Sequence, residues 1–202
     1  VFCCFNNSYK ITPSTFDSWA RILKSVKDSV LLIYAGKKSS AKANLIDEII
    51  YRGVDPNRLI FGESLPRQEY LARYRVANLF LDTQPYNAGT TASDALRMGL
   101  PVLTLKGNSY PSRMASSIIT AANLPELVAN TQKEYESLAI ELAKNNKKYK
   151  IIKDRLDANI SSSPLFDTMQ FTRSLETGFK IMLERYQKGL QPENIYIDNQ
   201  KQ

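Results

Sequence analysis

The sequence has 202 residues, of which 43% are hydrophobic and 23% charged, and its net charge is +7. This is the composition of a globular domain, and it excludes a disordered, collagenous or disulfide-rich chain. The sequence contains no histidine, so any general base must be Asp, Glu, Lys, Tyr or Cys. No apolar run approaches the roughly 18 residues of a membrane span, and no secretory signal is present.

Short apolar runs alternate with longer helical patterns along the chain. In chain order we expect a strand at 1–5, a helix at 14–27 capped by Ser14 or Thr15, a strand at 29–35, a helix at 40–52, a strand at 59–63, a helix at 66–77, a strand at 79–82, a helix that opens at Gly89-Thr90-Thr91, a strand at 101–105, a helix at 112–122, a short strand at 126–129, and helices at 131–144, 147–158 and 167–187. Continuously apolar strands separated by helices predict an α/β fold, a parallel sheet with helices on both faces.

Three features of the sequence have plain interpretations. Cys3 and Cys4 lie in an apolar run and are expected to be reduced core residues, because no histidine exists to complete a metal site. The basic stretch from Lys144 to Arg155 is expected to be the solvated face of a helix, because it lacks the interleaved aromatics and glycines of a nucleic-acid surface. The sequence opens directly on a strand, which we interpret as a piece of a longer protein with a polar tail at 188–202.

The loops that follow the strands carry the residues most suited to ligand binding. In parallel α/β sheets, ligands bind outside the carboxyl ends of the strands. That rule selects the loops after the first, third, fourth and fifth strands, at residues 6–12, 63–67, 83–90 and 106–113.

The segment Gly89-Thr90-Thr91 with Asp94 allows two interpretations. A helix N-terminus with free N–H groups holds phosphate, a preceding glycine lets the backbone approach, and Asp94 accepts hydrogen bonds from ribose hydroxyls. The same residues match a capping box, in which Thr91 caps the helix and Asp94 lies three positions later. Spacing alone does not decide between them.

The other loops offer similar pairs of alternatives. Lys10, with Asn7 nearby, is placed to bind a diphosphate, or is an ordinary exposed lysine. Tyr70, flanked by Arg67 and Arg73, offers a ring for a base, or packs on the sheet.

The loop after the fifth strand also carries candidate phosphate-binding residues. Gly107 and Arg113 there serve phosphate or merely begin a helix. No G-x-x-x-x-G-K-[ST] and no G-x-G-x-x-G occurs, which disfavours a P-loop NTPase and a dinucleotide dehydrogenase. The residues by themselves indicate an α/β nucleotide-binding domain.

Four segments carry a resemblance to a known family. The quoted stretches "FNNSYKITPSTFDSWARIL", "RLIFGESLPRQEYLARYRVANLFLDTQPYNAGTTASDAL", "GLPVLTLKGNSYPSRMASSII" and "ISSSPLFDTMQFTRSLETGF" resemble, in order and spacing, the C-terminal half of the catalytic region of protein O-GlcNAc transferases and SPINDLY-like bacterial relatives. The resemblance implies the C-terminal Rossmann-like domain of a GT-B glycosyltransferase at 1–187. It also implies that the N-terminal Rossmann half and tetratricopeptide repeats lie elsewhere in a longer chain.

The resemblance assigns roles around the phosphates and the ribose. Lys10 matches the lysine that contacts the diphosphate and assists the leaving group. Asn7 occupies the position at which animal members of the family have a glutamine near the phosphates. Thr90 and Thr91 match paired threonines on the phosphates, and Asp94 matches the acid that binds the ribose.

Further matches surround the base and the sugar. Arg67 replaces a lysine near the nucleoside, Tyr70 replaces a histidine that stacks on uracil, and Arg73 matches an arginine beside it. Leu65 offers its backbone to the base edge. Gly89 stands where the family has a histidine near the donor.

The implied activity is inverting transfer of N-acetylglucosamine from UDP-GlcNAc to Ser or Thr of a protein acceptor in the cytoplasm, with no metal or other cofactor. The fragment is expected to bind UDP and to turn over little by itself. The alternatives are a related transferase that uses GDP-fucose or UDP-glucose, and a non-catalytic nucleotide-binding or interaction module.

Overall fold

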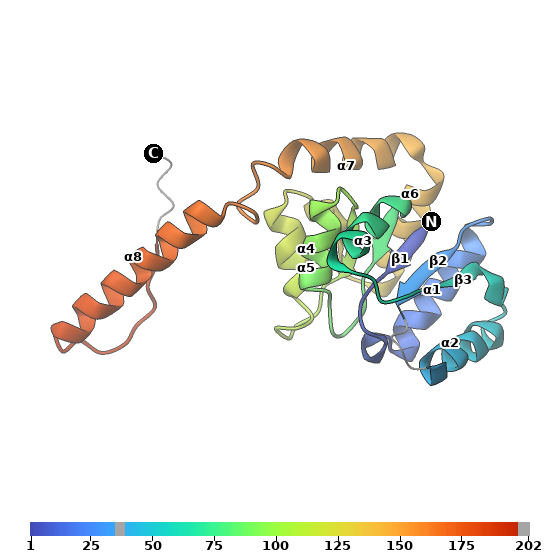
Figure 1. The fold of residues 1–202 in the computed structure, drawn as a ribbon, viewed down its shortest axis with the longest axis horizontal. Coiled ribbons are helices and arrows are strands. Elements are labelled where there is room, and N and C mark those ends of the chain that lie inside the picture. The colour runs from blue at the N-terminus through green and yellow to red at the C-terminus, as the bar shows by residue number, and fades with distance from the viewer. Residues whose placement is uncertain (35–38, 198–202) are drawn as a thin grey trace.

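A parallel sheet forms the centre of the protein in the computed structural model, which describes residues 1–34 and 39–197. Within that part of the chain the strands lie in the order β3-β2-β1-β4-β5-β6 (Figure 1). The strands are β1 (Phe2–Cys4), β2 (Leu31–Tyr34), β3 (Leu59–Gly62), β4 (Leu79–Leu81), β5 (Val102–Leu105) and β6 (Val128–Ala129). They lie at the predicted positions, each trimmed at its ends, which confirms the α/β fold.

The helices fill the connections as predicted. They are α1 (Pro13–Ser25), α2 (Ser39–Tyr51), α3 (Arg67–Ala72), α4 (Thr90–Arg97), α5 (Met114–Ala121), α6 (Gln132–Lys144), α7 (Asn146–Asn159) and α8 (Thr168–Gln187), with 3-10 turns at Ser8–Lys10, Pro56–Arg58, Arg73–Val76 and Pro125–Leu127. Right-handed crossovers that run in opposite directions from the centre place α1 and α4 on opposite faces of the sheet.

Two local predictions were wrong. The helix expected over 66–77 ends at Ala72 and tightens into a 3-10 turn, as helices often do at the C-terminus. The N-cap of α1 is Thr12, whose hydroxyl accepts from the amide of Thr15 at 3.3 Å, and not Ser14 or Thr15. Pro13 at the first helical position explains the earlier start, because its fixed φ suits the helix and it has no N–H to satisfy.

The core contains both cysteines and the only tryptophan. Cys3 and Cys4 are buried and free, and burial raises the pKa of each thiol, which confirms that they are core residues. Trp19 on α1 is fully buried, and its Nε1 donates to the Tyr135 hydroxyl on α6 at 3.1 Å. This bond joins α1 to α6.

The basic stretch predicted as a solvated helix face lies on α6 and α7. Lys150 pairs with Asp154 and Lys153 with Asp157, one helical turn apart, on the exposed side of α7. None of the helices in the described part of the chain has the length and hydropathy needed to cross a membrane.

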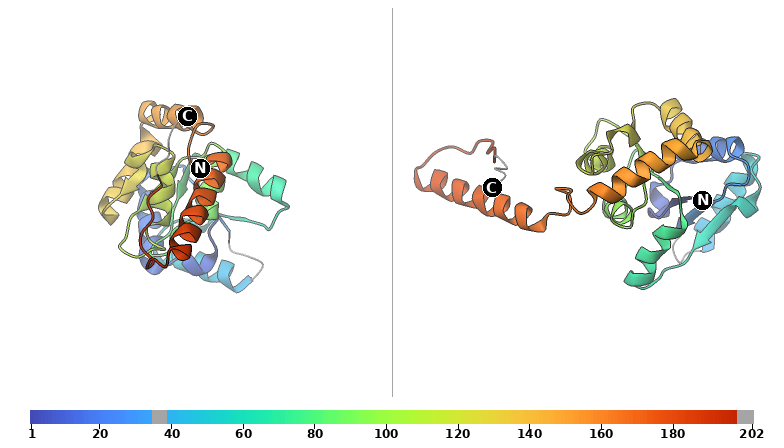
Figure 2. Two further views of the ribbon diagram at one scale, coloured as in Figure 1. Left: turned by 90° about the vertical axis from the view of Figure 1, so that its left-hand side faces the viewer. Right: turned by 90° about the horizontal axis from the view of Figure 1, so that it is seen from above.

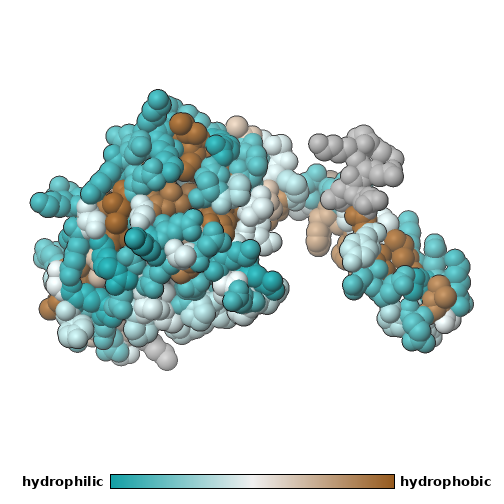
Figure 3. All heavy atoms as spheres, turned by 180° about the vertical axis from the view of Figure 1, so that it is seen from behind, coloured by the Kyte–Doolittle hydropathy of each residue, from teal (hydrophilic) through white to brown (hydrophobic). Residues whose placement is uncertain are grey.

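α8 stands apart from the sheet domain, as Figure 1 and the right view in Figure 2 show. No described residue of α8 belongs to the core, and Figure 3 shows hydrophobic side chains gathered along it. The large exposed apolar side chains of α8 are Met169, Phe171, Leu175, Phe179, Met182, Leu183 and Tyr186. Residues 188–197, the described part of the polar tail, form neither helix nor strand.

Candidate functional site

The loops after β1 and β4 meet at the centre of the sheet. β1 and β4 are neighbours, and the chain leaves β1 towards β2 but leaves β4 towards β5. This is the switch point at which open α/β sheets bind ligands. Asn6 from the first loop donates through Nδ2 to Asp82 Oδ1 at 3.1 Å and to Thr83 Oγ1 at 2.7 Å.

Asp82 is a buried carboxylate that organises the second loop. Its Oδ1 accepts from the amides of Thr83 and Ala88 at 2.8 and 2.7 Å, and its Oδ2 accepts from Thr104 Oγ1 at 2.6 Å. Burial raises the pKa of Asp82 to about 6, and these hydrogen bonds, with that from Asn6, limit the rise. The bonds close residues 82–88 into a loop that leads directly into α4.

The first turn of α4 does not form the capping box, one of the two interpretations of its sequence. The N-cap is Gly89, which supplies no side chain, and Thr91 lies two positions inside the helix. The Thr91 hydroxyl donates to Asn6 Oδ1 instead. Within the described residues, the amides of Gly89, Thr90 and Thr91 have no hydrogen-bond acceptor. The helix N-terminus therefore offers three donors, which is the arrangement that binds phosphate.

Lys10 points towards the same loop from the turn after β1. Its Nζ donates to the Asn87 carbonyl at 3.0 Å and lies 4.0 Å from the centre of the Tyr86 ring. Partial burial lowers the pKa of Lys10, and the nearby Asp82 charge opposes this effect. Asn7 is exposed and begins the 3-10 turn that carries Lys10, with no side-chain cap bond.

Arg67 and Asp94 form an ion pair between α3 and α4. Arg67 Nη1 and Nη2 donate to the two carboxylate oxygens of Asp94 at 2.9 and 2.7 Å. The pair raises the pKa of Arg67. The structure thus joins two predicted site residues that are far apart in sequence, and Asp94 contacts Arg67 rather than the helix backbone.

Tyr70 lies between two arginines, on the outer side of the buried Tyr74. The two tyrosine hydroxyls are 2.5 Å apart, and the Tyr74 hydroxyl reaches the Thr91 carbonyl at 3.3 Å. The Tyr70 ring is half-buried, and the guanidinium carbons of Arg67 and Arg73 lie 5.4 and 5.3 Å from its centre. Burial raises the pKa of Tyr70.

Arg73 and Leu65 border this aromatic cluster. The Arg73 guanidinium lies 4.0 Å from the Phe5 ring and donates to the Glu63 carbonyl at 2.8 Å, so it fixes the loop after β3. Leu65 is exposed in that loop. The structure therefore joins Arg67 to Asp94 and places Tyr70 between Arg67 and Arg73, whereas no hydrogen bond within the described residues joins Leu65 to them.

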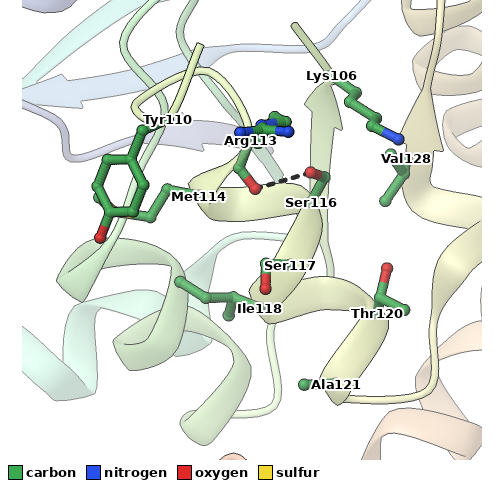
Figure 4. Close-up of a pocket in the computed structure, with 10 residues that line it drawn as sticks. All are labelled: Lys106, Tyr110, Arg113, Met114, Ser116, Ser117, Ile118, Thr120, Ala121 and Val128. Carbon is green, nitrogen blue, oxygen red and sulfur yellow. Dashed lines mark hydrogen bonds between the residues drawn. The ribbon is translucent and has the colours of Figure 1, made fainter. Parts of the chain in front are cut away.

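A cavity of about 760 Å³ lies next to this site, between the loop after β5 and α5. Figure 4 shows Lys106 and Arg113 at one end of the cavity and Ala121 at the other. Met114 lines the cavity and also packs against Gly89, where an added Cβ would lie 2.4 Å from its sulfur. Of the candidate residues singled out in the sequence, Arg113 lines this cavity, whereas Lys10, Thr90 and Asp94 do not.

Sequence reasoning missed Asn6 and Asp82. Each of them follows an apolar strand. For Asp82 the sequence did offer a signal, because its carboxylate comes directly after the wholly apolar run Leu79–Leu81. Among the described residues, no group of three or more acidic, cysteine or histidine residues is arranged to hold a metal ion.

Comparison with known proteins places the chain among glycosyltransferases. The model of glycosyl transferase family 41 matches residues 1–175. The UDP-N-acetylglucosamine–peptide N-acetylglucosaminyltransferase of Caenorhabditis elegans is 35% identical over 199 residues, which are 96% of this chain and 17% of that protein. The probable enzyme of the same kind, SEC, of Arabidopsis thaliana is 31% identical over 98% of this chain and 20% of the relative. The chain thus spans about a fifth of the length of these relatives.

Solved structures show the same relationship. A mutant of the O-GlcNAc transferase of Thermobaculum terrenum superposes with a TM-score of 0.85 and 34% identity, over 90% of this chain and 35% of that one. The C-terminal domain of a glycosyl transferase group 1 protein of Francisella tularensis superposes with a TM-score of 0.59 and 16% identity, over 80% of this chain and 84% of that one. The second match concerns the fold alone, and it agrees with the predicted α/β fold.

Proposed function

The chain belongs to glycosyl transferase family 41, and from that premise we propose that it is the half of a protein O-linked N-acetylglucosaminyltransferase that binds the nucleotide sugar. The observation that carries the proposal is the meeting of Lys10 with the N-terminus of α4 at the switch point of the sheet. Lys10 Nζ bonds to the Asn87 carbonyl, two residues before the N-cap Gly89. One partly buried cation and three free amides there match the charge of a diphosphate.

We call Lys10 and the first-turn amides of α4 the diphosphate seat. In the proposal the seat binds the two phosphates of UDP, with Thr90 and Asn7 beside it. Thr90 is exposed, and its hydroxyl has no partner among the described residues, so it is accessible to a ligand.

The nucleoside follows along the edge of the sheet towards α3. Asp94 accepts from the ribose hydroxyls, because a carboxylate has roughly four lone-pair sites and Arg67 occupies two of them. The half-buried ring of Tyr70 stacks on the base, and the backbone of Leu65 meets the base edge. Arg73 supports both by fixing the loop after β3.

The proposed reaction is transfer of the sugar to a Ser or Thr hydroxyl with inversion. The acceptor oxygen bonds to the anomeric carbon as the bond from that carbon to the β-phosphate oxygen breaks, and the hydroxyl proton passes to a base. Negative charge then grows on the departing UDP. Lys10 and the α4 amides stabilise that charge in place of a metal ion, which is electrostatic stabilisation of a leaving group.

The acceptor and the rest of the cleft belong to the longer protein in this proposal. GT-B enzymes place the active site between two Rossmann-like domains, and this chain supplies one of them. We therefore expect this chain alone to bind UDP and to show little or no transfer.

Calorimetry with UDP tests the proposal. We expect Lys10→Ala to weaken UDP binding by about 10- to 100-fold, which corresponds to one charge-assisted hydrogen bond of about 1.5–3 kcal/mol. Lys106→Ala, which removes a basic side chain that lines the neighbouring cavity, is the matched control and should bind as the wild type does.

Each alternative gives a different result in the same titrations. Equal affinities of wild type and Lys10→Ala remove Lys10 from the site. Tighter binding of GDP than of UDP favours a fucose donor. Failure of the wild type to bind any nucleotide contradicts the proposal and favours a non-catalytic interaction module.

A further inference from the structure

A buried pair of side chains connects the two parts of the diphosphate seat. Asn6 is 2% exposed and Asp82 is 3% exposed, and the Asn6 amide nitrogen donates to the Asp82 carboxylate. Side chains buried to this degree do not reach a ligand on the surface. Whatever they contribute to binding must act through their neighbours.

Asn6 acts on the α4 side of the seat. Its Oδ1 accepts the hydroxyl hydrogen of Thr91, at the second position of the helix. A threonine hydroxyl has one hydrogen to donate, so this bond leaves Thr91 with its backbone amide as the donor available to a phosphate. The orientation of the first turn, and hence of its free amides, depends on Asn6.

Asp82 acts on the Lys10 side of the seat. By accepting from the amides of Thr83 and Ala88 it closes the loop that contains Asn87. The Asn87 side chain donates to the Thr83 carbonyl at 2.8 Å, and the Asn87 carbonyl accepts from Lys10 Nζ at 3.0 Å. The position of the Lys10 ammonium group therefore depends on the same loop.

We infer that Asn6 and Asp82 are positioning residues for the diphosphate seat, because the buried hydrogen bonds from Asn6 to Asp82 and to Thr83 fix the Thr91 turn and the Lys10 loop relative to each other. This inference rests on the proposed function. In this inference the two residues do not touch the donor, and they hold a cation and a helix N-terminus in place for the diphosphate. Preorganised donors of this kind need no rearrangement when the charge arrives.

A purely structural role makes a different prediction. If the pair only stabilised the core, Asn6→Ala would lower the free energy of unfolding and reduce the affinity for all ligands of the site equally. If the pair positions the diphosphate seat, Asn6→Ala reduces the affinity only for ligands that carry phosphates. Uridine, which has the base and ribose of UDP but no phosphate, separates the two cases.

The test is a double-mutant cycle on UDP affinity with Asn6→Ala and Thr91→Val, measured by calorimetry, with uridine affinity followed by NMR titration. We expect each single change to weaken UDP binding by about 10-fold, the size of a lost hydrogen bond in a polar network. We expect the affinity for uridine to stay within about two-fold. In the Thr91→Val background, Asn6→Ala should add less than about a further three-fold, because the two residues act through one bond.

Thr91→Ser is the conservative variant, because it keeps the hydroxyl donor to Asn6, and it should bind UDP as the wild type does. If Asn6→Ala folds poorly, Thr91→Val still tests the bond to Asn6, since Thr91 is only partly buried.

The outcomes separate this inference from the proposed function. A wild type that binds UDP, with unchanged affinity in Asn6→Ala or with fully additive losses in the cycle, overturns the inference alone. Equal losses for UDP and uridine also overturn it, in favour of a structural role. A wild type that does not bind UDP overturns the proposed function and the inference together.

Discussion

Arg67 holds Asp94 through two parallel hydrogen bonds, one from each terminal guanidinium nitrogen to each carboxylate oxygen. The arginine side chain is 62% exposed, whereas that of Asp94 is 9% exposed. An ion pair with so exposed a partner contributes little to stability, because water screens the charges. Its effect is on geometry, because it orients the carboxylate and leaves the other lone pairs of that group free to accept hydrogen bonds.

From this geometry we expect Asp94 to recognise the ribose. The wild type should bind UDP about 10-fold more tightly than 2′-deoxy-UDP, the size of a lost hydrogen bond to a charged group. Asp94→Asn should weaken UDP binding and reduce this ratio towards one. Asp157→Asn, on the exposed side of α7, is the control. An unchanged ratio in Asp94→Asn, measured by calorimetry, would assign the ribose contact elsewhere.

Asp82 should make stability depend on pH between about 4 and 6. Its pKa rises from 3.8 in the unfolded chain to about 6 in the folded protein, so the folded state holds the proton more tightly. Its contribution to the free energy of unfolding is therefore greatest below pH 3.8, falls as pH rises to about 6, and is constant above. A shift of about two units corresponds to about 3 kcal/mol.

Denaturant unfolding of the wild type and Asp82→Asn across pH 4 to 7 checks this expectation. The difference in unfolding free energy between the two proteins isolates Asp82 from other carboxylates. Among its neighbours Cys4 and Tyr135 stay protonated in this range, because burial raises both pKa values, and Lys10 stays charged. A difference that does not change with pH would contradict the raised pKa.

Gly89 should tolerate a larger side chain only if Met114 moves. A Cβ at Gly89 would lie 2.4 Å from the Met114 sulfur, although its φ of −111° suits any residue. We expect Gly89→His to lower the free energy of unfolding by about 1–3 kcal/mol, as overpacking does. The double variant Gly89→His/Met114→Ala should recover most of the lost free energy of unfolding. Equal stability of the two variants in thermal unfolding would show that Met114 is not the obstacle.

The Tyr135 hydroxyl links the core to the site. It accepts from Trp19 Nε1 and donates to the Asp82 carbonyl at 3.0 Å, so Tyr135→Phe leaves two buried polar groups without a partner. The expected loss is about 1–3 kcal/mol of unfolding free energy. Tyr51→Phe, at an exposed tyrosine, should be neutral. Similar midpoints of urea unfolding for Tyr135→Phe and Tyr51→Phe would contradict this expectation.

The order of elements was predictable from the sequence because local patterns encode it. The apolar runs at 79–82 and 101–105 predict buried strands, and their spacing predicts crossover helices. The rule that ligands bind at the carboxyl ends of strands then selects the loops of Lys10 and Thr91. These inferences need no information about which strands are neighbours.

The partners of the site residues were not predictable in the same way. The Thr91 hydroxyl bonds to Asn6, which is 85 residues away, and Arg67 bonds to Asp94, 27 residues away. Such pairs follow from the strand order and not from any local period. The capping box failed for a local reason, since Gly89 takes the N-cap position and moves Thr91 into the helix.

α8 contributes no described residue to the core of the sheet domain, so we expect it to unfold separately from that core. A helix without tertiary packing is only marginally stable in water, so it melts gradually, whereas a packed core unfolds in one transition. Trp19 is the only tryptophan and is fully buried, so its fluorescence reports the core alone. Far-ultraviolet circular dichroism also records the 20 residues of α8. The two signals will therefore disagree on heating, and only the tryptophan signal yields the stability of the sheet domain.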